Sequence, residues 1–395
     1  MRITAVRVFE VTGELAFPDR FWEERLIRPM DIYPEHKAEG PTKLEEIEEG
    51  TYAMRSQFCE IETDEGVTGL AGPITSEQAF IIQHQLAPLL INHDPLATER
   101  VWDRLYRAMV HGRKGTPMMA LSAVDCALWD IKGKWADAPV YRLLGGPVRD
   151  TIPAYASALG YSLEPELVDE RAHEMVAQGY HAMKWFFRHG PTDGPEGIRQ
   201  NLTLVHTLRE AVGPEVDLMF DCWMSWDVPY TIDMARRLTP YEPRWIEEPV
   251  LPDKIPQYAE IRRNVTVPIA GGEHEYTRWG LKALMDAGAV DVLQPDIYWA
   301  GGISELQKIC ALASAYDLPV IPHGHSVPAT VQLIAAHPET TCPLLEYLVK
   351  WNVIHQFFLK DPIIPMEGQV TLPTAPGMGM ELDEMRIQER REISF

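Results

Sequence analysis

Six side chains that can bind metal ions or move protons recur along the second half of the chain at nearly equal intervals. The successive intervals are 26, 26, 23, 27 and 23 residues, each about the length of one strand plus one helix. In parallel β/α units, the carboxyl ends of the strands meet at one face, so these side chains are expected to converge. They are Asp221, Glu247, Glu273, Asp296, His323 and Glu346.

The first three of these residues predict a metal site. Three converging carboxylates repel one another and take up protons unless a cation lies between them. A hard divalent cation such as Mg²⁺, or Mn²⁺ in its place, prefers such oxygen ligands. A single Asp or Glu at a strand end often only caps the next helix. Because three occur in phase, we predict that Asp221, Glu247 and Glu273 bind the metal.

His323 and Asp296 predict a base. A carboxylate that accepts a hydrogen bond from one imidazole nitrogen orients the ring and raises its basicity. Without the Asp one unit earlier, a lone His on an apolar strand would more often be a core residue. Lys184 lies in another apolar run, Ala182–Phe186, and is expected to face inward, although a lysine there can also extend to the surface.

The elements that would position these residues begin near residue 150, where short apolar runs alternate with helical patterns. Strand and helix repeated in this way indicate parallel strands joined by crossover helices. Eight strands over roughly 200 residues favour a closed barrel over an open sheet. The predicted strands are 152–156, 182–186, 217–222, 244–247, 269–271, 290–293, 320–322 and 344–346.

The N-terminal third predicts a smaller α+β domain. Residues 3–11 and 57–63 alternate as strands do, and 67–70 can return as a hairpin partner. Ser76 is placed to cap a helix that runs to about Ile91. The segment 12–50 is long for a loop and is therefore expected to have a function.

Composition limits the function classes. The 395-residue chain carries a formal charge of −22, which disfavours binding to nucleic acid or to anionic membranes. Its five cysteines are odd in number and contain no CxxC pair, so a disulfide framework is not expected. The chain has no apolar run of about 18 residues and no signal peptide, which predicts a cytoplasmic protein.

Several longer motifs resemble the enolase superfamily, in its mandelate racemase subgroup, over nearly the whole chain. A closer likeness to the rhamnonate dehydratase family lies in Phe220–Ser225, Gly272–His274 and Pro322–Val327. The motifs of the wider resemblance are Ser122–Asp125 with Ala127–Asp130, Pro139–Gly146, Trp245–Pro249, Gly272–His274, and Gln294–Asp296 with Gly301–Gly302.

The resemblance implies an α/β fold, a modified TIM barrel of the (β/α)7β type with an N-terminal α+β capping domain. The bounds expected from it are 1–135 for the capping domain, with 12–50 as its substrate-reading loop, and 136–360 for the barrel. A C-terminal segment, 361–395, would return to the capping domain. Proteins of this family are commonly homo-oligomers, and we expect one here.

The resemblance also implies roles. Mg²⁺ on the three carboxylates would hold an enediolate formed by removing the proton next to a substrate carboxylate. His323 and Asp296 would form the family's dyad, and Glu346 would donate a hydrogen bond to the substrate carboxylate. Lys184 would match the first lysine of a Lys-x-Lys pair. The position of the second lysine is Phe186, so the base that it would supply is missing.

A single base favours dehydration over racemisation. His323 can remove the C2 proton and then protonate the departing C3 hydroxyl, which gives a 2-keto-3-deoxy acid. The predicted substrate is a small anionic sugar acid, a monocarboxylate such as L-rhamnonate, in contact with His274, Arg28 and Arg55. Two alternatives remain open: an epimerase with Lys184 or another residue as the opposite base, and a catalytically silent barrel that binds metal or serves in assembly.

Overall fold

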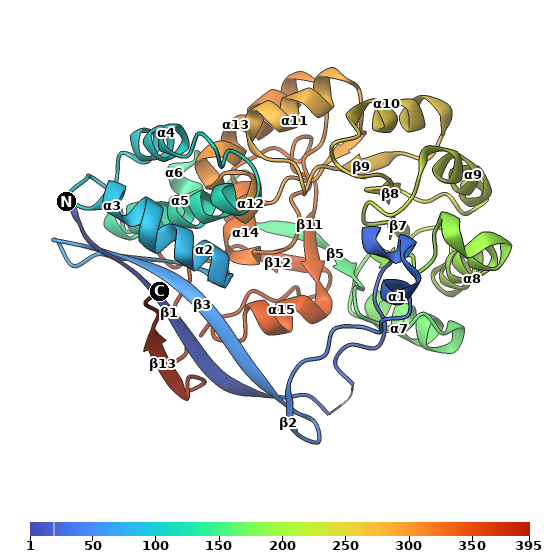
Figure 1. The fold of residues 1–395 in the computed structure, drawn as a ribbon, viewed down its shortest axis with the longest axis horizontal. Helices are drawn as coiled ribbons and strands as arrows, with labels where there is room; N and C mark the ends of the chain where they lie inside the picture. Colours follow the sequence, from blue (N-terminus) through green and yellow to red (C-terminus); the bar gives the residue numbers. More distant parts are fainter. Residues whose placement is uncertain (19) are drawn as a thin grey trace.

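The computed structural model describes residues 1–18 and 20–395 of the chain (Figure 1). Position 19, within the predicted loop 12–50, lies outside the described residues. Two sheets organise the molecule, one antiparallel and one parallel. The α/β class and the barrel with an N-terminal α+β part are therefore confirmed.

The antiparallel sheet has the strand order β13-β1-β3-β2, with β4 paired to β3. β1 and β3 are longer than predicted, because residues 12–16 pair with residues 51–55 and continue the ladder. Such long-range pairing extends strands beyond their local pattern. The strands are β1 (Ile3–Ala16), β2 (Glu46–Glu48), β3 (Thr51–Thr63), β4 (Thr68–Ile74) and β13 (Glu389–Glu392).

Helices cover this sheet on the side that faces the barrel. The predicted cap at Ser76 is wrong by one residue. Thr75 is the N-cap, since its side chain accepts from the Gln78 backbone and the Gln78 side chain accepts from Thr75 in return. The elements are α2 (Ser76–Ile81), a π-helical turn η2 (Ile82–Leu86), α3 (Ala87–Leu90), α4 (Thr98–Ala108), α5 (Thr116–Trp135) and α6 (Val140–Leu143).

The parallel strands have the order β10-β9-β8-β7-β6-β5-β11. The predicted strand 320–322 is instead an extended segment with one bridge, Val320 to Leu293, because the flanking prolines 319 and 322 have no N–H to donate. Its Val320 N also donates at 2.7 Å to the O atom of Thr341, in the segment that leads into β11, so it lies between β10 and the approach to β11. The strands are β5 (Thr151–Ser157), β6 (Ala182–Phe186), β7 (Asp217–Asp221), β8 (Trp245–Glu247), β9 (Ile269–Gly271), β10 (Val292–Leu293) and β11 (Leu345–Leu348).

A layer of apolar side chains fills the barrel. One residue comes from each of the eight extended segments, and together they form a buried cluster separate from the main core. Because side chains on a strand alternate with a period of two, the residue two positions further along each strand also faces inward. The cluster is Tyr155, Ala182, Met219, Trp245, Ala270, Val292, Ile321 and Leu344.

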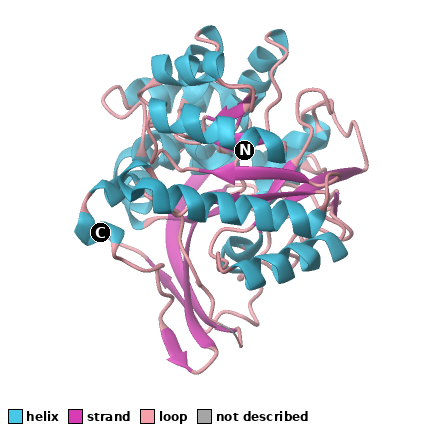
Figure 2. Cartoon of the chain, turned by 90° about the vertical axis from the view of Figure 1, so that its right-hand side faces the viewer, coloured by secondary structure: helices cyan, strands magenta, loops and turns pink. Residues whose placement is uncertain are grey.

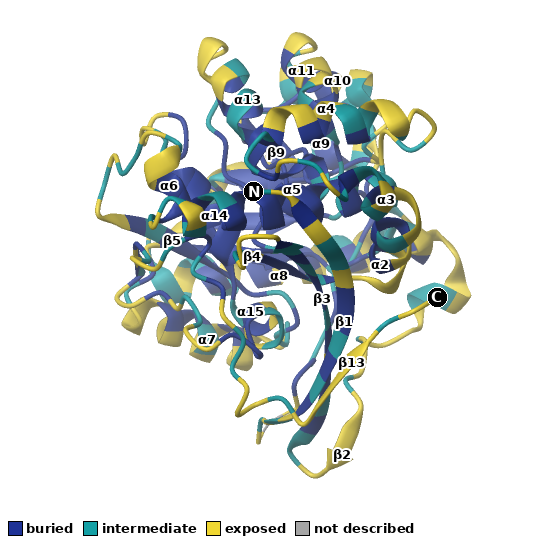
Figure 3. Ribbon diagram, turned by 90° about the vertical axis from the view of Figure 1, so that its left-hand side faces the viewer, coloured by how far each residue is buried: buried dark blue, intermediate teal, exposed yellow. Residues whose placement is uncertain are grey.

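The connecting helices surround the strands, and their inner faces are buried (Figures 2 and 3). None of the helices within 1–18 and 20–395 is long and apolar enough to cross a membrane. The barrel helices are α7 (Pro165–Ala177), α8 (Gly194–Val212), α9 (Val228–Leu238), α10 (Ile255–Asn264), α11 (Thr277–Asp286), α13 (Gly302–Ala315), α14 (Val327–Ala335) and α15 (Val349–His355). Shorter elements are η1 (Pro29–Ile32), α1 (Pro34–Lys37), η3 (Pro191–Asp193), η4 (Thr239–Tyr241), α12 (Ile297–Ala300) and β12 (Gln369–Thr371).

Candidate active site

Polar side chains form the next inward layer above the apolar cluster. Lys184, Asp221 and Glu247 each lie two positions beyond an apolar layer residue of β6, β7 or β8. Asp221 and Glu247 are direct partners in the ladder between β7 and β8. Residues at regular intervals along the sequence therefore lie at the same level of adjacent strands, and their charged groups are neighbours at one end of the barrel.

Lys184 is almost fully buried among carboxylates. Its Nζ lies 2.8 Å from Glu346 Oε1 and 3.5 Å from Asp221 Oδ2, and it also contacts Glu247 Oε1. Burial opposes the charge of the ammonium, but these carboxylates raise the pKa of Lys184 well above its usual value. Lys184 is thus a fixed cation directed inward.

The carboxylates of β7 and β8 are held by further hydrogen bonds. Glu247 Oε2 accepts from Trp245 Nε1 at 2.9 Å and from Gln294 Nε2 at 2.7 Å. Asp221 Oδ1 accepts from the Trp223 backbone at 2.8 Å. Burial and the charge of Glu247 raise the pKa of Asp221 well above its usual value. Asp221 therefore takes up a proton readily when no divalent cation lies beside it.

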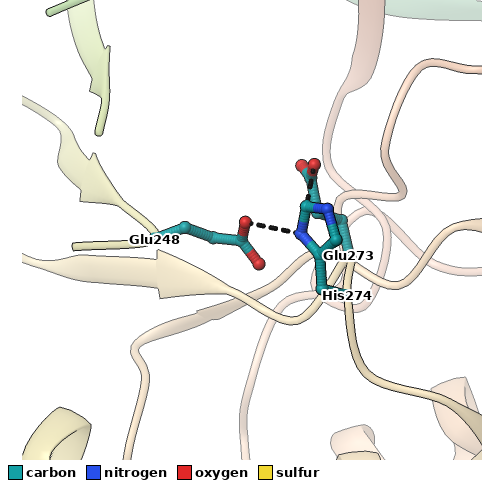
Figure 4. A group of neighbouring side chains, drawn as sticks. All are labelled: Glu248, Glu273 and His274. Atoms are coloured by element: carbon teal, nitrogen blue, oxygen red, sulfur yellow. Dashed lines mark hydrogen bonds and ion pairs between the residues drawn. The ribbon is translucent and has the colours of Figure 1, made fainter. Parts of the chain in front are cut away.

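A second charged group adjoins the first (Figure 4). In the described part of the chain, Glu248, Glu273 and His274 are the set whose potential ligand atoms all lie within 4.8 Å of one another. His274 Nδ1 lies 2.8 Å from Glu248 Oε2 and 3.6 Å from Glu273 Oε1. Burial opposes the imidazolium, but Glu248 raises the pKa of His274 to about 9.

The predicted metal ligands therefore lie beside two different cationic side chains, Lys184 and His274. Asp221 and Glu247 contact Lys184, whereas Glu273 lies beside His274. Burial raises the pKa of Glu273 to about 7. Because every donor in this set is a carboxylate oxygen, the chemistry suits a hard divalent cation.

His323 and Asp296 are in direct contact. His323 Nδ1 lies 2.7 Å from Asp296 Oδ2, while Asp296 Oδ1 accepts from the Tyr298 backbone at 2.7 Å. The other imidazole nitrogen, Nε2, lies 4.0 Å from Glu273 Oε2. Burial lowers the pKa of His323, but Glu273 and the bond to Asp296 outweigh it and raise the pKa to about 10. The carboxylate fixes the ring so that Nε2 is the nitrogen free to exchange a proton.

Glu346 is ionised in this arrangement. Its Oε2 accepts from the Gly324 backbone at 2.9 Å. Burial would raise its pKa, but Lys184 and His323 together hold the pKa below its usual value. An ionised carboxylate cannot donate a hydrogen bond, so the donor role implied by the resemblance needs a proton that Glu346 does not carry here.

A cavity of about 570 Å³ lies above these groups, between the barrel mouth and the N-terminal segments. Lys184, Asp221, Glu273 and His323 line it. Of the three predicted substrate contacts, Arg28 and Arg55 line the cavity, whereas His274 is not among the residues that line it. His274 instead lies behind the rings of Trp223 and Trp299, which do line it.

The two arginines differ in their surroundings. Arg28 Nη2 pairs with Glu39 at 2.7 Å and with Asp31 at 3.4 Å. Arg55 is 63% exposed on its side chain, with Glu45 at 3.8 Å. Arg55 is therefore the less engaged of the two cations.

The sequence reasoning missed a group of ring side chains around the cavity. Trp22 comes from the N-terminal segment, Trp299 follows β10, and Trp351 and His355 lie on α15. His325 was visible in the same short string as His323, two residues further on, but its position gave no signal of a role. The sequence of α15, which follows β11, contains no motif that would have predicted a role for Trp351 or His355.

Comparisons with known proteins agree over both parts of the fold. A family model described as "Enolase C-terminal domain-like" matches residues 167–386, and the "Mandelate racemase / muconate lactonizing enzyme, N-terminal domain" model matches residues 46–145. The chain belongs to the mandelate racemase subgroup of the enolase superfamily.

Relatives in this superfamily include enzymes with different reactions. An L-rhamnonate dehydratase of Saccharopolyspora erythraea is 36% identical over 97% of this chain and 97% of its own length. The structure of rhamnonate dehydratase from Gibberella zeae complexed with Mg has a TM-score of 0.83 at 30% identity, covering 98% of this chain and 95% of that one. A racemase from Streptomyces coelicolor A3(2) with bound magnesium has a TM-score of 0.80 at 27% identity, covering 98% of both chains.

The superfamily motif on α5 joins the N-terminal part to the barrel. Ser122 Oγ accepts from Gly301 N at 2.9 Å, Asp125 Oδ2 accepts from Ser304 N at 2.9 Å, and Trp129 Nε1 donates to Ser304 Oγ at 2.8 Å. These bonds hold the segment that follows Asp296. The motif therefore fixes the C-terminal end of α12, the short helix whose N-cap is Asp296.

Proposed function

We propose that this protein is a Mg²⁺-dependent sugar acid dehydratase that converts an aldonate to a 2-keto-3-deoxy acid. The observation that carries the proposal is one Asp-supported histidine facing a cavity whose floor holds carboxylates and a buried ammonium. The relatives named as rhamnonate dehydratases support the same reaction and suggest L-rhamnonate or a related monocarboxylate as the substrate.

Asp221, Glu247 and Glu273 are the residues that would hold Mg²⁺. Their buried carboxylates repel one another, and a divalent cation would relieve this repulsion. Burial, with a smaller contribution from neighbouring carboxylates, raises the pKa of Asp221 and of Glu273. When bound, the metal supplies Lewis-acid stabilisation of the charge that develops on the substrate carboxylate.

The chain's own residues account for the proton transfers. A divalent cation held by Glu273 would offset the negative charge that raises the pKa of His323, so that Nε2 would be free to take the C2 proton. The electron pair of the C2–H bond then forms the C2–C3 double bond as the C3–O bond breaks. The same imidazolium then gives its proton to the departing hydroxyl, so water leaves. The enol gains a proton at C3 and its hydroxyl loses one, which gives the 2-keto acid. Asp296 stabilises the imidazolium throughout.

Lys184 supplies a fixed positive charge and not a second base. Its raised pKa keeps it protonated, and Phe186, at the position of the second lysine of the family pair, is fully buried. Epimerisation needs a base on the opposite face of C2, so this observation favours elimination. Glu346, as an anion, orients the Lys184 ammonium.

The test is a screen of aldonic and aldaric acids for 2-keto product, run in D₂O with proton NMR at C2. We expect product from a monocarboxylate, and its loss after exhaustive chelation with recovery on adding Mg²⁺. Product that persists without any divalent metal would contradict the metal role. Exchange of the C2 proton with inversion but without loss of water would favour the epimerase.

A further inference from the structure

A continuous series of rings borders the cavity away from the carboxylates. Trp299 contacts His323, with ring centroids 4.9 Å apart, and also contacts His325 at 5.7 Å. His325 contacts His355 at 4.7 Å, and His355 contacts Trp351 at 5.3 Å. The series leads from the proposed base to α15, so a substrate whose C2 lies at His323 would extend its tail along it.

The hydrogen bonding of His355 sets which of its nitrogens carries a proton. His355 Nδ1 lies 3.0 Å from the backbone carbonyl oxygen of His325. A carbonyl can only accept, so Nδ1 must donate and the neutral ring has its lone pair on Nε2. Nε2 has no hydrogen-bond partner among the residues that the structure describes. His355 therefore offers an acceptor to whatever occupies this end of the cavity.

The ring surroundings keep His355 neutral. Burial lowers its pKa to about 4, and the charge of His323 lowers it further, although the bond to the His325 carbonyl acts in the opposite direction. Burial lowers the pKa of neighbouring His325 to about 3. The Nδ1 atom of His325 is buried and has no hydrogen-bond partner within the described chain. Neither ring supplies a cation.

We propose that His355 determines substrate specificity by accepting a hydrogen bond at Nε2 from a hydroxyl on the substrate tail, which excludes acids whose tail ends in a second carboxylate. A hydroxyl can donate to the Nε2 lone pair, whereas a carboxylate has no proton to donate and would face that lone pair directly. This inference rests on the proposed dehydratase function, and it adds the residue that selects an uncharged tail.

Of the three arginines that line the cavity, two do not offset this exclusion, and the third, Arg55, is 63% exposed on its side chain and lies 3.8 Å from Glu45. Arg25 binds both oxygens of Asp31, at 2.7 and 3.0 Å, and donates to several backbone carbonyls. Arg28 is paired with Asp31 and Glu39. Their charges are largely compensated within the N-terminal segment.

The experiment compares three His355 variants on matched substrates. His355→Leu removes the acceptor, His355→Gln restores one through its side-chain oxygen, and His355→Lys introduces a cation. Val353→Gln, on α15 but outside the cavity lining, is the control. The substrates are an aldonate turned over by the wild type, its analogue without the tail hydroxyl, and the aldarate of the same configuration.

His355→Leu should lower kcat/KM for the hydroxylated aldonate about tenfold, mainly through KM, and leave the deoxy analogue unchanged. His355→Gln should recover part of the loss. His355→Lys should raise the aldarate-to-aldonate ratio of kcat/KM at least tenfold. Val353→Gln should match the wild type.

Equal losses on both aldonates, or an unchanged ratio in His355→Lys, would overturn the inference while leaving the dehydratase proposal intact. A wild type that dehydrates no sugar acid would overturn both. If His355→Leu does not fold, as judged by its melting temperature, the comparison of His355→Gln with His355→Lys decides the matter.

Discussion

Asp296 uses its two carboxylate oxygens for two different purposes. One oxygen accepts from the Tyr298 backbone N–H and so caps the N-terminus of α12, and the other accepts from His323. Capping and base support, which sequence patterns treat as alternatives, occur together in one side chain. The N-terminus of α12 thus fixes the Asp296 carboxylate, and this carboxylate fixes the His323 ring, so that neither side chain rotates independently.

This geometry predicts unequal effects at His323 and Asp296. His323→Asn should abolish both product formation and C2 exchange with D₂O, because the nitrogen that takes the proton is gone. Asp296→Asn should slow turnover about 10²- to 10³-fold without abolishing it, because the ring loses its orientation and basicity but keeps Nε2. Proton NMR of the substrate in D₂O measures both.

His206→Asn is the matched control, since His206 is exposed on α8 and lies away from the cavity. It should leave both rates unchanged. Wild-type exchange in His323→Asn would instead identify another group as the base and bring the epimerase forward.

Regular spacing made part of this site predictable. The intervals between Asp221, Glu247 and Glu273 follow from the β/α repeat, and alternation along β6 directs Lys184 inward. What could not be predicted was how the charges compensate one another. Lys184 lies among Asp221, Glu247 and Glu346, and the contact between His274 and Glu248 depends on side-chain packing that no sequence interval records.

At the scale of elements, apolar runs in the sequence predicted where the strands lie. They did not predict the strand bounds that depend on pairing with a distant strand or on proline. Residues 12–16 look like loop but form ladder with β3. Residues 320–322 resemble a strand, yet Pro319 before them and Pro322 at their end limit the pairing described to one bridge, between Val320 and Leu293. The series of rings beside the cavity was not predicted, because its members come from α12, from the segment after Pro322 and from α15, and none of these has a sequence pattern of its own.

The contact between α5 and the segment 301–304 contains a buried titrating group. Asp125 Oδ2 accepts from Ser304 N, and its other oxygen is buried without a partner in the described chain. Burial raises its pKa from about 3.8 to about 7. Between these values the folded protein holds a proton that the unfolded chain releases, so the Asp125 contribution to stability is complete below about 3.8 and is lost as the pH rises to about 7.

Asp125→Asn should remove this pH dependence. Between pH 5 and pH 8 the free energy of unfolding of the wild type should fall by on the order of 2 kcal/mol more than that of the variant. Urea unfolding at the two pH values measures the difference in slope, whatever constant offset the amide introduces. Asp253→Asn, at an exposed position, should follow the wild type. Parallel curves for wild type and Asp125→Asn would contradict the buried carboxylate as the cause.

At the scale of the whole molecule, the cavity exists because the N-terminal segment closes over the barrel mouth. Glu23 N donates to Gly160 O at 2.9 Å, Lys350 Nζ pairs with Glu23 at 2.7 Å, and Ile27 N donates to Phe187 O at 2.8 Å. Trp22, held by these contacts, packs on Trp351 of α15 with ring centroids 4.8 Å apart. Parts of the chain more than 300 residues apart therefore enclose one substrate space.

Gly160 lies where the N-terminal segment meets the barrel. Its φ is +89°, and a Cβ there would lie 2.2 Å from the Trp22 ring. Gly160→Ala should displace Trp22, loosen the cover of the cavity and lower kcat/KM for the sugar acid at least tenfold.

Gly213→Ala is the matched control, because Gly213 has a comparable φ of +68° but open space where its Cβ would stand. Both variants should lose about 1 kcal/mol of stability from the left-handed backbone. Only Gly160→Ala should lose substrate affinity, because only its new methyl group meets the segment that covers the barrel. Equal kcat/KM in the two variants, at similar melting temperatures, would show that this segment does not need Trp22 in place to close the cavity.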